Sequence, residues 1–218
     1  MASRLFPRIT EEGFEELRLR IGQPVEDEHS FVRVASEDSI RNYALGIGDG
    51  NPLWLDPEYA QKTRWGSLLA PPTFLYATSR IVSGYVGGLP GVHAMFAGSH
   101  WRFLQPIRGG CRINPQSLLK DVIVKETRFA GPAVQQTYEV SFEDDEGQLL
   151  ATADSWCFRT ERDTARELRK YEAQRIEPHV YTEEELEEIW QQYCREGSGA
   201  PPLATGRTSR SATSCRWW

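Results

Sequence analysis

A change of hydropathy period near residue 92 constrains the fold of this chain more than any other feature. From there to residue 162, four successive stretches alternate polar and apolar residues, as strands with one buried face do. The segments RGG, FAGP and DDEGQ separate the stretches and have the composition of hairpin turns. The pattern predicts an antiparallel meander with strands in VHAMFAGSHWRFLQPI, RINPQSLLKDVIVKETR, AVQQTYEVSFED and LLATADSWCFRTER.

The segment before the strands, APPTFLYATSRIVSGY, predicts one long buried helix that begins at Pro71-Pro72 and ends at Gly84. Its apolar residues cover most of the helix circumference, so we expect the sheet to curl around it in an α+β fold. Ser36 is the expected N-cap of another helix, and residues 1–22 read as an amphipathic helix. Residues 30–35 predict a short strand.

Charge and composition narrow the class of protein. The chain has 218 residues, a net charge of −6 and a pI near 5.4, which argues against binding nucleic acid or an anionic membrane. No apolar run is long enough for a membrane span, and the N-terminus lacks the apolar core of a secretory signal, so we expect a cytoplasmic protein. The four cysteines have no CxxC spacing, so we expect reduced thiols and no metal site. We also expect no cofactor.

The stretch YALGIGDGNPLWLDPEYA contains the turn Gly48-Asp49-Gly50-Asn51-Pro52. Gly, Asp and Asn are common in turns because they tolerate turn backbone conformations, so one interpretation is an ordinary turn without a functional role. The spacing does not fit a dinucleotide loop, and the later ligands of a calcium loop are missing. The other interpretation is a rigid turn that positions the carboxylate of Asp49 and the amide of Asn51 for a function.

The longer pattern around this turn resembles the signature of the MaoC-like dehydratases, the (R)-specific enoyl-CoA hydratases. The resemblance covers about residues 5–165, continues through RWGSLLAPPTFL and HAMFAGSHWRFLQPI, and implies a hot-dog fold. In this family an aspartate and a histidine add water across a 2-enoyl thioester. Asp49 matches the catalytic acid/base and Asn51 the orienting amide, while Trp54, Gly66 and Pro72 match substrate-contacting positions.

The catalytic histidine of the family is replaced by Trp54. An imidazole donates and accepts a proton near neutral pH, whereas an indole N–H only donates. The resemblance therefore implies an acyl-thioester hydratase/dehydratase half that is weak or inactive alone, and the sequence leaves open whether the isolated chain is an enzyme. The alternative is a non-catalytic acyl-CoA-binding scaffold. A hot-dog thioesterase would need a carboxylate on the buried helix, which has none.

No other reactive side chain is a clear replacement for the catalytic histidine of the family. His93 and His100 are separated by an odd number of residues, which places them on opposite faces of a regular strand. Cys111 lies in the RGGCRI turn, and we expect it to be a packed turn residue rather than a reactive thiol.

The chain divides into three expected parts. Residues 1–161 form the hot-dog half, residues 162–197 a charged helical linker, and residues 198–218 a disordered tail. Codons for Ala204–Trp218 exist that, read one base over, encode the stretch that usually opens a second hot-dog half, so we hypothesise a frameshifted second domain. We expect the partner to be a second copy of the chain or a catalytic MaoC-like half, and the ligand an acyl-CoA or acyl-carrier thioester.

Overall fold

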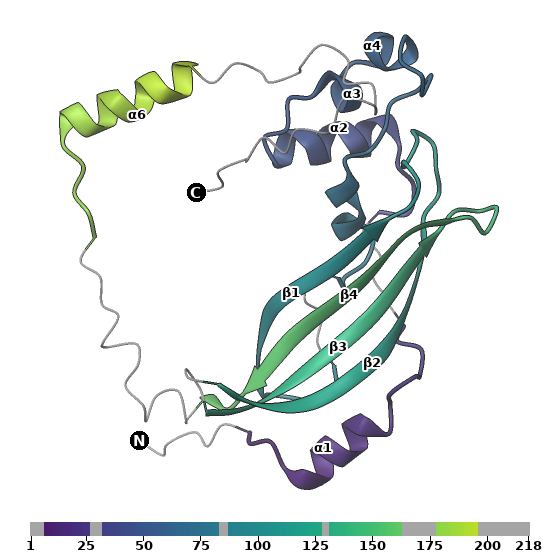
Figure 1. Cartoon of the computed structure of the whole chain (residues 1–218), viewed down its shortest axis with the longest axis vertical. Helices are drawn as coiled ribbons and strands as arrows, with labels where there is room; N and C mark the ends of the chain where they lie inside the picture. The colour runs from purple at the N-terminus through teal and green to yellow at the C-terminus, as the bar shows by residue number, and fades with distance from the viewer. Residues whose placement is uncertain (1–6, 27–31, 83–86, 128–130, 163–177, 196–218) are drawn as a thin grey trace, which may run out of the picture.

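The computed structural model describes residues 7–26, 32–82, 87–127, 131–162 and 178–195. One curved antiparallel sheet dominates it (Figure 1), and its strands are β1 (His93–Phe103), β2 (Asn114–Thr127), β3 (Gly131–Glu143) and β4 (Leu149–Thr160). All four predicted strands are therefore confirmed, and the sheet with its few helices is an α+β fold.

The order of the strands differs from the predicted meander. The sheet runs β1-β4-β3-β2, so β1 pairs with β4 and not with β2. The FAGP and DDEGQ segments join neighbouring strands as expected, but the RGG segment belongs to a connection between opposite edges of the sheet. The reason is that Ala70, Gly109 and Gly110 bond this connection to other loops: Ala70 N–H donates to Ile107 O at 2.8 Å, and Gly109 N–H to Leu68 O at 2.8 Å.

The concave face of the sheet carries the core. Along β3 every second side chain is buried, including those of Val140 and Phe142, and β4 contributes Ala151 and Ala153. These side chains form one cluster with Phe74, Leu75, Ile81 and Val82. The apolar segment before the strands therefore fills the curve of the sheet, as the sequence predicts.

This segment is not the long helix that its composition predicts. Only Pro72–Ala77 is helical, as the 3₁₀ helix η1, and turns follow as far as Val82, where the described part of this segment ends. Polar side chains inside the segment compete for the backbone: the Thr78 hydroxyl donates to Leu75 O at 2.9 Å, and Ser79 Oγ accepts from Ile81 N–H at 3.2 Å. Such local bonds favour turns over a continued helix.

A buried arginine fixes the chain that leads into β1. Arg159 is 3% exposed and donates to the carbonyl oxygens of Gly87, Leu89 and Val92. Gln136 also donates to Gly87 O, at 3.0 Å, and accepts from Arg159 at 3.3 Å. Burial lowers the pKa of the Arg159 guanidinium, so these carbonyl partners offset part of the cost of removing its charge from water.

The remaining helices follow the sequence closely. Helix α2 (Glu37–Gly46) begins after Ser36, whose side chain accepts from Ser39 N–H as predicted. The helix expected in residues 1–22 is α1 (Glu11–Arg18), and the described residues around it form turns and loops. Short helices α3 (Pro52–Leu55) and α4 (Pro57–Gln61) follow α2. The strand expected at residues 30–35 is reduced, within its described part, to a single bridge between Val34 and Arg112.

The two edge strands of the sheet differ in whether their outer backbone groups are paired. The outer edge of β2 is covered by the chain itself, because Gly22 and Val25 N–H donate to Leu119 and Ser117 O at 2.8 Å each. No strand or bridge of the described part pairs with the outer edge of β1. The long edge of β1 therefore offers unpaired backbone groups to another strand.

A β-bulge in β1 changes the faces of the two strand histidines. The register shifts between Phe96 and Gly98, which adds one residue to the strand. His93 pairs with Thr160 and His100 with Asp154, which are six residues apart on β4. Both histidines therefore lie on the convex face, so opposite faces were a wrong prediction that assumed a regular strand. Gly98 permits the bulge, since a Cβ there would lie 2.6 Å from the Trp156 ring.

Helix α6 (Glu183–Arg195) lies in the expected linker and stands apart from the sheet in Figure 1. Thr182 and Glu185 cap it reciprocally, with Thr182 N–H donating to the Glu185 carboxylate at 2.8 Å. The expected tail, residues 198–218, lies outside the described residues. None of the helices in the described ranges is long and apolar enough to cross a membrane.

The packing of Phe142 gives a test of this core. Phe142 is fully buried and stacks on Trp101 with ring centroids 5.5 Å apart. We expect Phe142→Ala to lower the free energy of unfolding by about 3–5 kcal/mol, because it leaves a cavity under β3, one of the two central strands. Phe96→Ala is the matched control, since Phe96 is 49% exposed and should cost less than half as much in urea unfolding. Equal losses would contradict this description of the core.

Candidate functional site

The turn from Gly48 to Pro52 follows the end of α2 and positions the side chains of Asp49 and Asn51. Gly48 has φ +72°, a backbone conformation that side chains disfavour, and it lets the chain reverse directly after the helix. Asp49 Oδ1 then accepts from Asn51 N–H at 3.1 Å, and Asn51 Oδ1 accepts from Leu53 N–H at 3.0 Å. Asn51 is therefore the N-cap of α3, and its side-chain carbonyl oxygen bonds the backbone.

The Trp54 side chain also bonds to this turn. Its indole Nε1–H donates to Asp49 Oδ2 at 2.8 Å, so each carboxylate oxygen of Asp49 accepts one hydrogen bond from within the turn. The structure thus brings Asp49, Asn51 and Trp54 together within one short loop. A water-activating pair needs a partner that both gives and takes a proton, and the indole only gives a hydrogen bond.

An apolar hollow of about 260 Å³ lies beside this loop. Trp54 and Pro72 form part of its wall. The remainder comes from Leu69, Ala70, Leu75, residues 103–107 and Leu150–Ala151. The sequence did not single out Phe103, Leu104 or Leu150 as site residues. The segment HWRFLQPI carried the only signal, because its apolar residues continue past the end of β1.

The backbone at the entrance to η1 limits which N–H groups can face a ligand. Pro71 and Pro72 have no N–H, Ala70 N–H donates to Ile107 O, and Phe74 N–H donates to Pro71 O. Thr73 therefore carries the remaining N–H between residues 70 and 74, and its carbonyl accepts from the Tyr43 hydroxyl at 2.6 Å.

Gly66 lies apart from this hollow. It has φ +66° and lines a different depression of about 480 Å³ with Glu58, Ser67 and Gly110. The structure therefore does not bring Gly66 to the wall that Trp54 and Pro72 share.

Two cysteines, Cys111 and Cys157, favour the protonated thiol. Burial raises the pKa of Cys157 to about 11, and burial together with Asp144 and Asp145 raises that of Cys111. Both shifts oppose formation of the reactive thiolate. Within the described ranges, no group of three His, Cys, Asp or Glu side chains is arranged to hold a metal ion.

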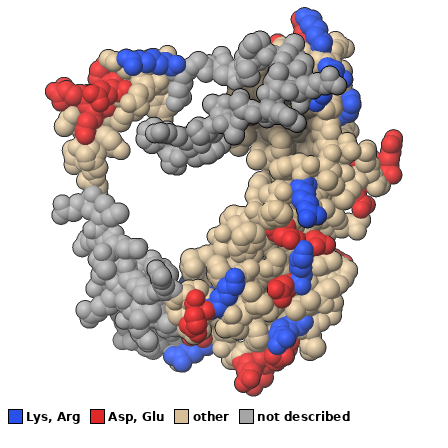
Figure 2. Space-filling view, in the orientation of Figure 1, with Lys and Arg blue, Asp and Glu red and all other residues tan. Residues whose placement is uncertain are grey.

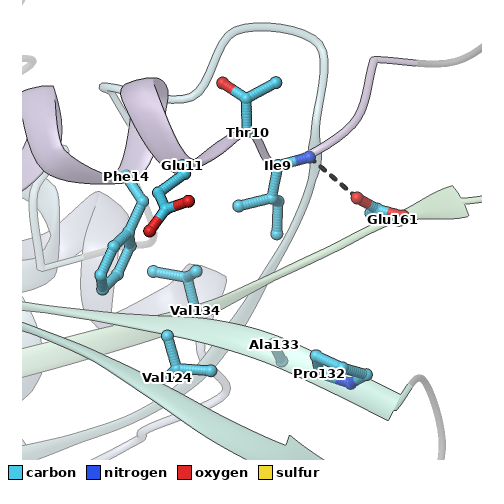
Figure 3. A pocket seen from close by; sticks show the side chains of 9 residues that line it. All are labelled: Ile9, Thr10, Glu11, Phe14, Val124, Pro132, Ala133, Val134 and Glu161. Atoms are coloured by element: carbon cyan, nitrogen blue, oxygen red, sulfur yellow. Dashed lines mark hydrogen bonds between the residues drawn. The ribbon is translucent and has the colours of Figure 1, made fainter.

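A second hollow, of about 350 Å³, separates α1 from one end of the sheet (Figure 3). Ile9, Phe14 and Val134 give it apolar walls, and the Glu11 carboxylate faces it. The Glu161 carboxylate accepts from Ile9 N–H at 2.9 Å, which ties the start of the described chain to the end of β4. This hollow contains none of the site residues that the sequence predicts.

The curved sheet and the apolar segment within it define a hot-dog fold, and comparisons with known proteins agree. Residues 21–153 match the profile of the FAS1-like dehydratase domain region. The chain therefore belongs to this family, within the MaoC-like dehydratases, as the resemblance of its sequence implied.

Relatives and solved structures extend the comparison. The chain is 29% identical over 90 residues to a UPF0336 protein of Streptomyces avermitilis, covering 39% of this chain and 60% of that protein. A structure titled MaoC-like dehydratase superposes with a TM-score of 0.56 at 17% identity, covering 76% of this chain and 51% of the other. The ChsH1-ChsH2 complex of Mycobacterium tuberculosis gives a TM-score of 0.53 at 15% identity, covering 69% and 95%.

The bond between Trp54 and Asp49 predicts a measurable coupling. In a double-mutant cycle with Trp54→Phe and Asp49→Ala, we expect a coupling energy of about 1 kcal/mol, since a partly exposed bond to a carboxylate is weakened by solvent. Urea unfolding of the four proteins measures it. Asp38→Ala, at a carboxylate that lies by Arg41, is the control and should be additive with Trp54→Phe. Additivity at Asp49 would show that the bond contributes nothing.

The buried thiol predicts a pH dependence. Because the folded pKa of Cys157, about 11, exceeds its ordinary value of 9.0, the stabilisation is fully present below pH 9 and is lost as the pH rises towards 11. Between about pH 8 and pH 10 we expect the wild type to lose about 1 kcal/mol more unfolding free energy than Cys157→Ala. Urea titrations at the two pH values measure the difference, and equal losses would refute it.

Proposed function

We propose that this chain is the thioester-binding half of a hot-dog hydratase/dehydratase. It holds the acyl group of a 2-enoyl or 3-hydroxyacyl thioester in the hollow beside Trp54, and a second hot-dog half supplies the proton-transferring pair. Residues 1–161 form the binding half, and residues 162–197 are the linker on its C-terminal side. The proposal extends the family membership to an activity and a substrate class.

The proposal rests on the hydrogen bonds that the Asp49 carboxylate accepts. Its two carboxylate oxygens accept from Asn51 N–H and from the Trp54 indole, at 3.1 and 2.8 Å. General acid–base catalysis contributes roughly 10²–10⁴-fold to such a step and needs a partner that exchanges protons. Trp54 cannot exchange one, whereas its ring adds apolar surface to the hollow. The site is therefore suited to holding an acyl chain rather than to hydrating it.

The open edge of β1 supports the need for a partner. The outer edge of β2 is paired by the chain itself, whereas no described segment pairs with the outer edge of β1. A second hot-dog sheet, in a copy of this chain or in a catalytic half, would satisfy that edge. The solved neighbour ChsH1-ChsH2 is titled as a complex of two chains.

A non-catalytic scaffold is the second candidate function, and the same observation at Asp49 favours it. The two candidates differ in what a second half would do. A scaffold binds the thioester whatever its partner, whereas a dehydratase half gains turnover once a catalytic half is added.

Calorimetric binding of crotonyl-CoA, together with its enoyl absorbance as the measure of turnover, tests what both candidates share, and turnover gained on adding a catalytic hot-dog half distinguishes the dehydratase half from the scaffold. We expect the pure protein to bind crotonyl-CoA without turnover, and Asp49→Asn to leave the background rate unchanged because Asp49 relays no proton. Trp54→Ala should weaken binding by enlarging the hollow, while Ile47→Ala, at a side chain that is 51% exposed, serves as the control. Turnover by the wild type that Asp49→Asn removes would refute the proposal, and so would failure to bind any acyl thioester.

A further inference from the structure

Three half-buried side chains, Tyr76, Ser99 and Trp101, form a hydrogen-bond cluster that the proposed function does not use. The Trp101 indole Nε1–H donates to the Tyr76 hydroxyl at 3.0 Å and to the Ser99 hydroxyl at 2.9 Å. The two hydroxyl oxygens lie 2.7 Å apart, so one of them donates to the other. The cluster therefore joins η1, which carries Tyr76, to β1, which carries the other two residues.

This cluster contains one more hydroxyl hydrogen than it can use. Tyr76 and Ser99 each carry one such hydrogen, and the contact between their oxygens uses only one of the two. The Trp101 indole cannot accept the other, because its N–H only donates. The three side chains bond to no other polar group of the described residues. One hydroxyl therefore keeps a free donor, whichever way the pair is oriented.

Ser99 and Trp101 lie on the concave face of the sheet. Ser99 pairs with Ser155 and Trp101 with Ala153, and both residues of β4 are buried in the curve. Side chains stand roughly perpendicular to a sheet, whereas a strand that pairs with the outer edge of β1 bonds its backbone groups. An acceptor for the free hydroxyl hydrogen is therefore expected from inside the curve rather than from a neighbouring strand.

The cluster adjoins the hollow beside Trp54 on both of its sides. The Trp101 ring stacks on Phe103 with centroids 5.4 Å apart and planes within 6° of each other, and Phe103 lines the hollow. Tyr76 directly follows Leu75, which lines the hollow as well. The Phe103 and Trp101 rings thus form a continuous aromatic wall from the hollow to the two hydroxyls.

The chemistry of the cluster is neutral, unlike that of the opposite face. Lys120 Nζ lies 2.8 Å from the Glu139 carboxylate and 2.9 Å from that of Asp154, and both carboxylates alternate along their strands with buried core residues. Figure 2 shows side chains of both signs close together over the sheet. None of the three cluster side chains carries a charge. A ketone or hydroxyl oxygen therefore suits the free donor better than a carboxylate does.

We propose that Tyr76 and Ser99 bind a neutral oxygen atom, a ketone or a hydroxyl, on the acyl chain of a thioester held in the hollow beside Trp54. The thioester rests on the proposed function, whereas the free donor rests on the cluster itself. The aromatic wall holds the hydrocarbon between the hollow and this oxygen. The site therefore selects oxygen-substituted acyl chains over plain hydrocarbon chains. Tyr76 and Ser99 are binding residues with no part in proton transfer.

Calorimetry with octanoyl-CoA, 5-oxooctanoyl-CoA and 7-oxooctanoyl-CoA tests this site in the full-length protein. We expect the wild type to bind at least one oxo ester roughly threefold to tenfold more tightly than octanoyl-CoA, the range of a neutral hydrogen bond. The double variant Tyr76→Phe/Ser99→Ala should bind that ester no more tightly than octanoyl-CoA, because a ketone buried without a donor is disfavoured.

The double variant is needed because each single variant keeps a hydroxyl that can still donate. Tyr76→Phe leaves the Ser99 hydroxyl without its hydroxyl partner, and Ser99→Ala does the same for Tyr76. The matched control is Ser141→Ala/Tyr193→Phe, which removes the same two groups elsewhere. Ser141 lines a different groove, and Tyr193 is 65% exposed on α6. The control should keep the wild-type preference for the oxo ester.

The outcomes separate this site from the proposed function. Wild-type protein that binds octanoyl-CoA but prefers neither oxo ester overturns the oxygen site and leaves the proposed function standing. Failure of all three esters to bind overturns both. If the absent preference is accompanied by a double variant with an altered association state, the free donor serves a partner chain and the ligand is wrong.

Thermal unfolding checks that the double variant retains the fold. A folded double variant with the wild-type preference for an oxo ester contradicts the assignment to Tyr76 and Ser99. If the double variant does not fold, the comparison of the three esters in the wild type still decides whether the oxygen site exists.

Discussion

The burial of residues 68–82 in the concave face of the sheet is the constraint on which the rest of the structure depends. Phe74 and Phe142 are completely buried in the same cluster, and the sheet can curve only because something apolar fills it. The segment also anchors the site: Ala70 bonds to Ile107, and Thr73 accepts from Tyr43 on α2. The core and the candidate site therefore share their walls.

The Asp49 loop is held by hydrogen bonds from its own backbone and from the Trp54 indole. The glycine, the carboxylate and the capping amide keep the geometry of the loop, because each serves the backbone. The indole N–H of Trp54 donates to one carboxylate oxygen of Asp49, and the same ring borders the hollow. These hydrogen bonds hold the loop whether or not a proton is ever passed through it.

Local patterns predicted local elements well. The alternation of polar and apolar residues along each strand and the Ser36 cap are patterns within a few positions of the sequence, and the strands and the cap are both present. The helix expected from residue 71 to residue 84 was wrong in type and length, because the Thr78 and Ser79 side chains bond their own backbone. The order of the strands was wrong too, because hairpin-type turn residues also occur in longer connections. In the site, Trp54 and Pro72 meet as neighbours of one hollow, whereas Gly66 faces another.

The sequence by itself determined which segments form strands and that Ser36 caps a helix, and it places at position 54 an indole, which donates a hydrogen bond but does not accept a proton near neutral pH. Those properties follow from residue type and spacing within a few positions of the chain. Only the tertiary structure decided that β1 lies beside β4, that Leu104 and Leu150 both line the hollow beside Trp54, and that Arg108 reaches Trp65. The physical reason is that these neighbours are 43 or more residues apart in sequence, and only packing of the whole core brings them together.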